Sequence, residues 1–281
     1  MEELLTPQTW ELIRMALMED LGSGDITTEN TVSPEARARG VIRAKASLVL
    51  AGLELARAVF FTLDPGVVFR GLTQDGEALE AGAGIAEVEG SARVLLKGER
   101  LALNFLQRLS GIATLTAQSV RCVQGTRARI LDTRKTTPGW RHLEKYAVRM
   151  GGGVNHRYSL GHGILIKDNH IALAGGLSRA VEKAKRGCPP LMKIEVEVQS
   201  LDQVEEALRA GADMIMLDNM SCEEMARAVR VIGGRAWVEA SGGIGLEGLA
   251  AVAQTGVDFI SLGRLTHSAP AVDIALKYER I

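Results

Sequence analysis

The chain has 281 residues, of which 46% are hydrophobic and 24% charged, a composition typical of a folded α/β enzyme and unlike that of disordered or fibrous proteins. Its formal net charge of −1 provides no overall field that would attract nucleic acid, so we expect no nucleic-acid partner and only a local anion site. Three cysteines without metal-ligand spacing indicate neither a disulfide framework nor a zinc site. We expect a cytoplasmic protein with no membrane partner, because no apolar run reaches membrane-spanning length and the acidic N-terminus does not resemble a signal peptide.

The first third of the sequence predicts an α+β domain. A helix is expected from Thr6 and Pro7 to about Asp20, because a threonine followed by proline marks a helix start. The next segment, EDLGSGDITTEN, is interpreted as a structural turn rather than a phosphate loop, since no strand leads into it. Strand-like runs follow from Gly40, reading GVIRAKASLVLAG, GVVFRGL, IAEVEG and ARVLLKG, with one helix around Leu53–Leu63. Successive strands joined by short turns favour an antiparallel sheet with helices on it.

A long helix is predicted from Glu99 to about Gln124, because apolar residues recur there at three- and four-residue steps. Arg100 lies at the predicted start of this helix. The helix dipole and the guanidinium would both favour an anion at that point. A salt-bridged surface arginine is the alternative interpretation.

After Gly125 short apolar strands begin to alternate with amphipathic helices. The strands read ARILDT, GGGVNHR, GILIKD, KIEVEV, MIMLDN, AWVEAS and FISLG. This alternation predicts right-handed parallel βα units, and the lack of a G-x-G-x-x-G fingerprint after the first strand argues against a dinucleotide-binding sheet. Seven strands favour a closed or nearly closed barrel, one strand short of the (β/α)8 type.

Polar side chains and glycines follow the carboxyl end of each predicted strand, where such barrels place their sites. They are Arg134, Lys135, His156, Arg157, Lys167, Glu197, Asp218, Ser241, Gly242, Gly243 and Gly263. The cations suit a carboxylate-bearing polyanion, the glycines let a phosphate approach the backbone, and the two acids are placed to hold Mg²⁺. The alternatives are a solvated basic surface, a Glu197–Lys193 ion pair, and Asp218 as a helix cap. No Ser-His-Asp or Cys-His nucleophile is indicated.

The segments DTRKTTPG, NHR, LIKDNH, EVEV, MLDN, EASGGI and ISLG, with GER before the long helix and EDLGSGDITTE near the start, resemble the quinolinate phosphoribosyltransferase family. The resemblance covers almost the whole chain. It implies an N-terminal α/β sandwich with an antiparallel sheet and a seven-stranded parallel α/β barrel, an incomplete TIM-like barrel. We expect these domains over residues 1–108 and 109–268, and a C-terminal helix over 269–281 that packs back on the first domain.

The same resemblance implies a pentosyltransferase that moves phosphoribose from phosphoribosyl pyrophosphate to the nitrogen of quinolinate. Pyrophosphate and CO2 would be released, and nicotinate mononucleotide would be formed for NAD synthesis. The family also implies a homodimer with its sites at the subunit interface; the sequence leaves further assembly into hexamers open.

Roles for individual residues follow from the resemblance alone. The residues expected to bind the carboxylates of quinolinate are Arg134, His156, Arg157 and Lys167, with Arg100 from the neighbouring subunit. Lys135 would lie between quinolinate and the pyrophosphate, and Glu197 and Asp218 would contact the ribose hydroxyls and Mg²⁺; these three are the expected catalytic residues. The 5-phosphate would be held by Ser241, Gly242, Gly243 and Gly263.

His162 departs from the family pattern, since we expect an acidic or small residue at its position. It is interpreted as a surface loop histidine; the alternative is a pocket residue that alters the pH dependence. One alternative function is that of a same-fold phosphoribosyltransferase with another acceptor, of the molybdenum-transport-associated type, and the arginines at 134 and 157 argue against it. Another is a non-catalytic binding protein, which would predict the loss of Lys135, Glu197 or Asp218.

Overall fold

The computed structural model describes residues 4–281, which divide by packing into two compact units. The first contains the chain up to Ala117 together with Thr137–Gly152 and Thr266–Ile281, and the second contains Gln118–Thr136 and Gly153–Leu265. These units do not follow the continuous limits 1–108 and 109–268. The difference arises because the chain returns to the first unit twice, once through helix α5 (Arg141–Met150) and once through its C-terminal segment.

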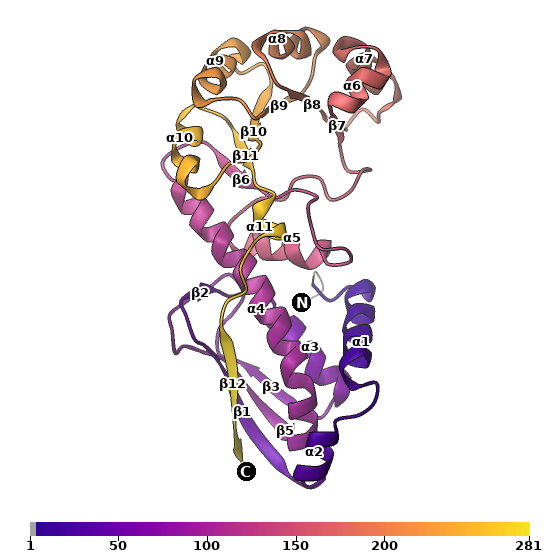
Figure 1. The fold of residues 1–281 in the computed structure, drawn as a ribbon, viewed down its shortest axis with the longest axis vertical. Helices are drawn as coiled ribbons and strands as arrows, with labels where there is room; N and C mark the ends of the chain where they lie inside the picture. The colour runs from indigo at the N-terminus through magenta and orange to yellow at the C-terminus, as the bar shows by residue number, and fades with distance from the viewer. Residues whose placement is uncertain (1–3) are drawn as a thin grey trace. The chain divides into compact units, whose positions relative to one another are not determined.

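The first unit is built on a four-stranded antiparallel sheet, as the sequence predicted. Its order is β12-β1-β5-β3 (Figure 1), and its strands are β1 (Arg37–Ala44), β3 (Val68–Gly71), β5 (Gly84–Ser91) and β12 (Ile274–Arg280). A two-stranded ladder joins β2 (Leu48–Val49) to β4 (Ala78–Leu79). In β1, buried residues alternate with more exposed ones, as expected of a sheet with one buried face.

Helices α1 (Pro7–Leu21) and α3 (Leu53–Leu63) agree with the expected elements. The Thr6 side chain accepts a hydrogen bond from the Thr9 amide and so caps α1. The interpretation of the DITTE segment as a turn was wrong, because it forms the short helix α2 (Ile26–Thr31). The Asp25 carboxylate starts this helix by accepting from the Thr28 amide at 2.9 Å, a cap that the surrounding glycines obscured.

The C-terminal helix predicted over 269–281 was also wrong. This segment contains β12, which pairs antiparallel with β1 from Ala38 opposite Arg280 to Ala44 opposite Ile274. The buried Ile274 and Leu276 lie two residues apart, which is the period of a strand. The segment does belong to the first unit.

Helix α4 spans Ala92–Cys122 and therefore begins earlier than predicted. The ARVLLKG run expected as a strand forms its first two turns; Leu95 is fully buried and the adjacent Leu96 is exposed, as on a helix with one buried face. Arg100 consequently lies in the third turn and not at the helix start. The expected contribution of the helix dipole at Arg100 is therefore wrong, because the dipole effect is confined to the first turn.

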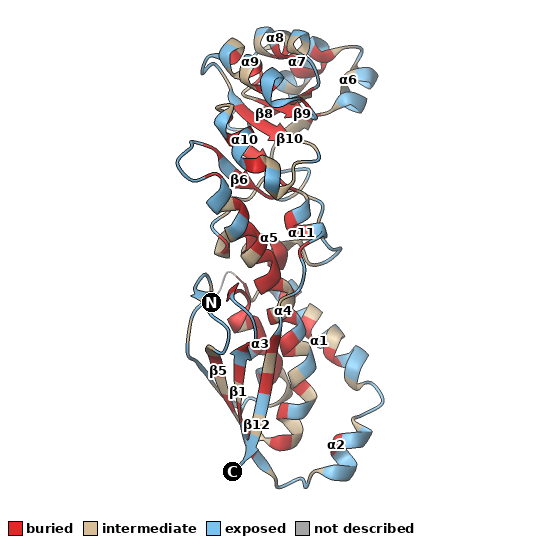
Figure 2. Cartoon of the chain, turned by 60° about the vertical axis from the view of Figure 1, so that its left-hand side comes forward, coloured by how far each residue is buried: buried red, intermediate tan, exposed pale blue. Residues whose placement is uncertain are grey.

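The second unit contains a parallel sheet of six strands in the order β6-β11-β10-β9-β8-β7, outlined by helices in Figure 1. The strands are β6 (Arg129–Leu131), β7 (Ile164–Ile166), β8 (Ile194–Val198), β9 (Met214–Asp218), β10 (Trp237–Ser241) and β11 (Phe259–Ser261). The helices are α6 (Asp168–Ala174), α7 (Leu177–Gly187), α8 (Leu201–Ala210), α9 (Cys222–Ile232) and α10 (Leu249–Gln254). Figure 2 shows that β8, β9 and β10 form the buried centre of this unit.

The seventh predicted strand, GGGVNHR, is reduced to one parallel bridge between Val154 and Leu131. The backbone beyond the bridge bonds to a side chain instead of a neighbouring strand, since Asp132 Oδ1 accepts from the His156 amide at 2.8 Å. The architecture is thus the expected parallel α/β barrel, with six regular strands and a single-residue seventh.

Gly111 tests the packing of α4 in the first unit. A Cβ at this position would overlap the carbonyl oxygen of Pro270, a backbone atom. We expect Gly111→Ala to lower the free energy of unfolding by roughly 2–4 kcal/mol, because neither backbone can give way without strain. Gly187→Ala is the control: no heavy atom lies within 4 Å of its added Cβ, and alanine should change stability by about 1 kcal/mol or less in the favourable direction. Urea unfolding of both variants measures the difference; equal stabilities would contradict this packing.

Candidate active site

Most of the barrel residues singled out in the sequence lie at or just beyond the carboxyl end of a strand of the parallel sheet, while His156 and Arg157 follow the single bridge at Val154. Arg134 and Lys135 follow β6, and Lys167 follows β7 directly. Asp218 and Ser241 are the last residues of β9 and β10. Because neighbouring strands are parallel, these ends share one edge of the sheet, where α/β barrels carry their sites.

Two arginines at this edge, Arg134 and Arg157, interact electrostatically. Burial, and next the positive charge of Arg134, lower the pKa of Arg157. Arg157 Nη1 donates to the Gly163 carbonyl at 2.8 Å, which fixes the side chain. Like charges held together in a partly buried place favour a ligand of the opposite charge, and paired guanidiniums match carboxylates in geometry.

The predicted acids take partners that differ from the alternatives considered for them. Glu197 forms an ion pair with Lys167, whereas Lys193 pairs with Asp213 at 3.2 Å. Asp218 accepts from the side-chain amide of Asn219 at 2.9 Å. It does not cap α9, because Ser221 and Glu224 form the capping box of that helix.

The turn after β10 contains the glycines that the sequence predicted would let a phosphate approach the backbone. Gly242 and Gly243 have positive φ angles of 95° and 56°, which glycine adopts without steric cost. A Cβ at Gly242 would overlap the Asn219 side chain and lie 2.8 Å from the Asn219 backbone nitrogen. No heavy atom lies within 4 Å of a Cβ at Gly243, so the backbone is open to a close-approaching group there.

A buried cluster behind these residues was missed in the sequence. His156 Nε2 lies 3.1 Å from Glu195 Oε2 and 3.5 Å from Glu239 Oε2. The exposed fraction is 5% for Glu195 and 0% for Glu239. A usable signal was present: Glu195 precedes Glu197 by two residues and Glu239 precedes Ser241 by two, so strand alternation puts each on the same face as a predicted site residue.

A second missed residue is Asp132, which is fully buried directly after β6. Besides the His156 amide, it accepts from Asn155 Nδ2 at 2.6 Å. Asp132 thus holds the segment that carries His156 and Arg157 against the end of β6. The printed motif DTRK contains it, but its burial depends on the tertiary structure.

The buried cluster predicts a pH-dependent stability. Burial, and next the negative charge of Glu195, raise the pKa of Glu239 well above its ordinary 4.5. Above about pH 4.5 the folded state therefore binds more protons than the unfolded state, and the free energy of unfolding falls as pH rises. Glu239→Gln removes this pH-dependent contribution of Glu239 to the free energy of unfolding. We expect its stability relative to the natural chain to increase between about pH 5 and about pH 8, by about 1.4 kcal/mol per unit of raised pKa. Urea unfolding across this range measures it; a difference that does not change with pH would contradict a protonated Glu239.

The remaining predicted residues are exposed. Lys135 lies in the loop after β6, and Arg100 is exposed on α4 of the first unit. His162 is an exposed loop histidine whose Nδ1 lies 2.7 Å from the Ser159 hydroxyl, which agrees with its interpretation as a surface residue. His162 belongs neither to the buried cluster of His156, Glu195 and Glu239 nor to the residues at the strand ends.

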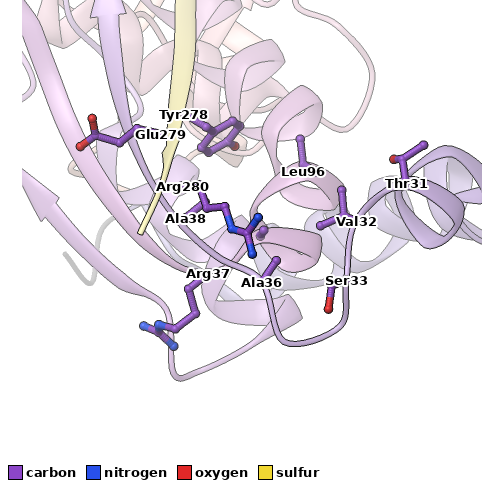
Figure 3. Close-up of a pocket in the computed structure, with 11 residues that line it drawn as sticks. Thr31, Val32, Ser33, Ala36, Arg37, Ala38, Leu96, Tyr278, Glu279 and Arg280 are labelled. Carbon is purple, nitrogen blue, oxygen red and sulfur yellow. The ribbon is translucent and has the colours of Figure 1, made fainter.

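A separate pocket of about 310 Å³ lies wholly in the first unit (Figure 3). It is bordered by the end of α2, the start of α4 and the strands β1 and β12. Ser33, Arg37, Leu96, Tyr278 and Arg280 are among its lining residues. None of the lining residues belongs to the expected substrate site.

The two acids expected to bind the metal, Glu197 near the end of β8 and Asp218 at the end of β9, offer carboxylate oxygens. Such hard donors suit Mg²⁺ better than softer metals. Among the described residues, His156, Glu195 and Glu239 also have ligand-type atoms within 4.8 Å of one another.

In residues 4–281 no helix is both long and apolar enough to cross a membrane.

A parallel α/β barrel with two interacting arginines, two carboxylates and a glycine turn at its strand ends defines a class of barrel enzymes that act on anionic substrates. Family models sharpen this class: the quinolinate phosphoribosyl transferase N-terminal domain matches residues 25–110, and the C-terminal domain matches residues 112–277. The chain belongs to the quinolinate phosphoribosyl transferase family.

Individual relatives agree over nearly their whole length. The chain is 45% identical to the probable carboxylating nicotinate-nucleotide pyrophosphorylase of Bacillus subtilis, covering 96% of this chain and 93% of that protein. It is 44% identical to the carboxylating nicotinate-nucleotide pyrophosphorylase of Mycobacterium leprae, covering 95% of each. The crystal structure of NadC from Streptococcus pyogenes superposes with a TM-score of 0.95 at 43% identity and covers 99% of both chains.

Proposed function

We propose that this chain transfers phosphoribose from phosphoribosyl pyrophosphate to quinolinate and decarboxylates the product, giving nicotinate mononucleotide, pyrophosphate and CO2. It is accordingly a pentosyltransferase of NAD biosynthesis. The observation that carries the proposal is the pair Arg134 and Arg157 at one edge of the sheet, where burial, and next the positive charge of Arg134, lower the pKa of Arg157 and so favour an anion between them. Two adjacent ring carboxylates, as in quinolinate, would satisfy both guanidiniums.

In this proposal Arg134, Arg157 and Lys167 supply positive charge to the two carboxylates, and His156, whose ring nitrogens contact the Arg157 amide and Glu195, supports Arg157 in the carboxylate site. Lys167 is paired with Glu197 in the structure, so quinolinate would take over part of that ion pair. Quinolinate binding would thereby change the ion pair of Glu197, a residue that is expected to contact the ribose. Lys135, exposed in the adjacent loop, would lie between the acceptor and the departing pyrophosphate.

Phosphoribosyl pyrophosphate would bind at the neighbouring strand ends. Ser241, Gly242, Gly243 and Gly263 would hold the 5-phosphate through backbone N–H groups, which the positive φ angles at Gly242 and Gly243 leave accessible. Glu197 and Asp218 would hold Mg²⁺ and contact the ribose hydroxyls. When bound, Mg²⁺ neutralises charge on the pyrophosphate that leaves.

The residues orient two reactants, and no protein nucleophile is needed. The quinolinate nitrogen forms a bond to C1 of the ribose as the bond from C1 to pyrophosphate breaks. Positive charge develops on the sugar in this step, and the carboxylates of Glu197 and Asp218 stabilise it. The C2 carboxylate then leaves as CO2; the bonding pair stays on C2 beside the cationic ring nitrogen and takes up a proton. Holding both reactants in line supplies much of the acceleration.

The test is an assay of the purified chain with quinolinate, phosphoribosyl pyrophosphate and Mg²⁺, with nicotinate as the parallel acceptor. We expect nicotinate mononucleotide and an equal amount of CO2 from quinolinate, and no product from nicotinate. Lys135→Ala should abolish most of the product. Binding of phosphoribosyl pyrophosphate without any product from quinolinate would overturn the assignment of quinolinate as the acceptor. It would point to a same-fold transferase that acts on another acid.

We further propose a homodimer in which Arg100 completes the partner's carboxylate site, and a cytoplasmic location, which its unpaired Cys122, Cys188 and Cys222 suit. The exposed position of Arg100 on α4 supports a role toward another chain. Further assembly of dimers into hexamers is the larger form that the family resemblance allows.

Mixing two inactive variants tests this arrangement. Arg100→Ala and Lys135→Ala are each expected to lose about 10²-fold or more in kcat/KM, as for the removal of a charged substrate contact. In a mixed dimer one site would have both residues intact. We therefore expect about a quarter of natural activity after random subunit exchange, since roughly half of the dimers are mixed and each has one good site. No recovery in verified mixed dimers would contradict a contribution of Arg100 across the interface.

A further inference from the structure

We propose that Glu195 and Glu239, which take no part in the transfer reaction, are positioning residues that hold His156 in one tautomer and thereby fix Arg157 for acceptor binding. The inference deepens the proposed function and rests on it only for the identity of the acceptor. The network itself is a property of the ligand-free barrel, and all four residues lie in the second unit.

Both ring nitrogens of His156 have identified contacts. The Arg157 backbone N–H donates to His156 Nδ1 at 2.7 Å, so Nδ1 must present its lone pair and carries no proton. The proton of the neutral ring is then on Nε2. This nitrogen lies 3.1 Å from Glu195 Oε2 and 3.5 Å from Glu239 Oε2, and its N–H is directed at the carboxyl pair.

This tautomer distinguishes a hydrogen-bond network from a metal centre. The ligand-type atoms of His156, Glu195 and Glu239 lie within 4.8 Å of one another, which would suit a metal by distance alone. A neutral imidazole has one unprotonated nitrogen, and here that nitrogen accepts the Arg157 N–H. Nε2 therefore has a proton to donate and no lone pair for a metal.

The carboxyl pair needs a proton of its own. Glu195 Oε1 and both carboxyl oxygens of Glu239 are buried without a hydrogen-bond partner among the described residues, and the donors beside the two acids are the imidazole N–H and the Ser261 hydroxyl. Two adjacent buried carboxylates repel one another, so one acid stays neutral. Glu239 is the more deeply buried of the two and is assigned as the neutral acid, and Glu195 is the nearer acceptor of the imidazole N–H.

The last residue of this hydrogen-bond network is Arg157, which the proposed function assigns to binding the acceptor. His156 is held at its ring by Glu195 and at its backbone amide by Asp132. Its Nδ1 in turn holds the Arg157 amide. The guanidinium of Arg157 therefore extends from a main chain fixed at consecutive residues, and positive charge for the acceptor comes from the arginines and Lys167 while His156 remains neutral.

The first experiment examines the histidine directly. Two-dimensional ¹H–¹⁵N correlation of side chains in the full chain labelled with ¹⁵N-histidine, assigned with His156→Gln, reports which ring nitrogens carry protons. At neutral pH we expect His156 to be neutral with its proton on Nε2. A doubly protonated ring, or a proton on Nδ1, would overturn the proposal. So would a shift of this signal when Zn²⁺ is added to chelator-treated protein, because that outcome would make the cluster a metal site.

The second experiment separates positioning from general stability. Glu195→Gln exchanges the carboxyl group that contacts His156 Nε2 for an amide, and we expect KM for quinolinate to rise about 10-fold with KM for phosphoribosyl pyrophosphate unchanged. Glu239→Gln keeps the shape and charge of a neutral acid and should change either KM by less than about 3-fold. Glu205→Gln, on the exposed face of α8, is the matched control and should behave as the natural chain.

An equal rise in both KM values for Glu195→Gln, or no rise in either, would overturn the positioning role, and so would a large loss in Glu239→Gln. These outcomes differ from a failure of the proposed function. If the natural chain formed no product from quinolinate, the acceptor assignment would fail, while the histidine spectrum would still decide the network.

Discussion

Replacement of Arg157 by alanine is expected to raise KM for quinolinate by about 10²–10³-fold. A charge-assisted, two-pronged hydrogen bond to a carboxylate would be lost, a contribution of about 3–4 kcal/mol where the partner charge is left in a partly buried site. Arg157→Lys keeps the charge but loses the planar fork, so an intermediate rise of about 10-fold is expected.

Steady-state kinetics with each substrate varied in turn measure this prediction. Arg209→Ala is the control, since Arg209 lies on the outer helix α8 and pairs with Glu205 at the exposed surface. It should leave both KM values unchanged. Arg134→Ala is expected to resemble Arg157→Ala, because the two guanidiniums face the same anion. A rise in KM for phosphoribosyl pyrophosphate, with that for quinolinate unaffected, would reassign the arginine pair to the phosphates.

Replacement of Asp218 by asparagine is expected to lower kcat by about 10²–10³-fold with a much smaller change in KM for quinolinate. The substitution preserves shape and removes a negative charge from the end of β9, where positive charge on the sugar would be stabilised in the transition state. The amide would also be a poorer ligand for Mg²⁺ than the carboxylate.

Two readouts separate these contributions. Single-turnover rates at saturating substrate report the chemical step, and titration calorimetry of Mg²⁺ with phosphoribosyl pyrophosphate reports the metal-dependent binding. Asp202→Asn, an acid in the first turn of the outer helix α8, is the matched control. An unchanged kcat in Asp218→Asn, with intact folding, would exclude a role for this carboxylate in the transfer step.

The two units differ in how far the sequence predicted them. Short apolar strands alternating with capped helices predicted the parallel sheet of the second unit, because each βα unit is defined by local periodicity and caps. The GGGVNHR run was the exception: it has the composition of a strand but forms one bridge, since Asp132 bonds the following backbone. In the first unit, the start of α4 and the strand β12 were assigned to the wrong element because short apolar runs fit a helix and a strand equally well.

The sequence by itself determined which residues are the candidates for the chemistry. Arg134, Arg157, Lys167, Glu197 and Asp218 are recognisable because each polar residue ends an apolar run, and the carboxyl ends of parallel strands meet at one edge. Only the tertiary structure decided which groups those residues contact. The Lys167–Glu197 pair, the interaction of Arg134 with Arg157 and the buried His156–Glu195–Glu239 cluster join segments far apart in the chain. Their burial and their distances depend on the register between strands, which no local pattern of residues specifies.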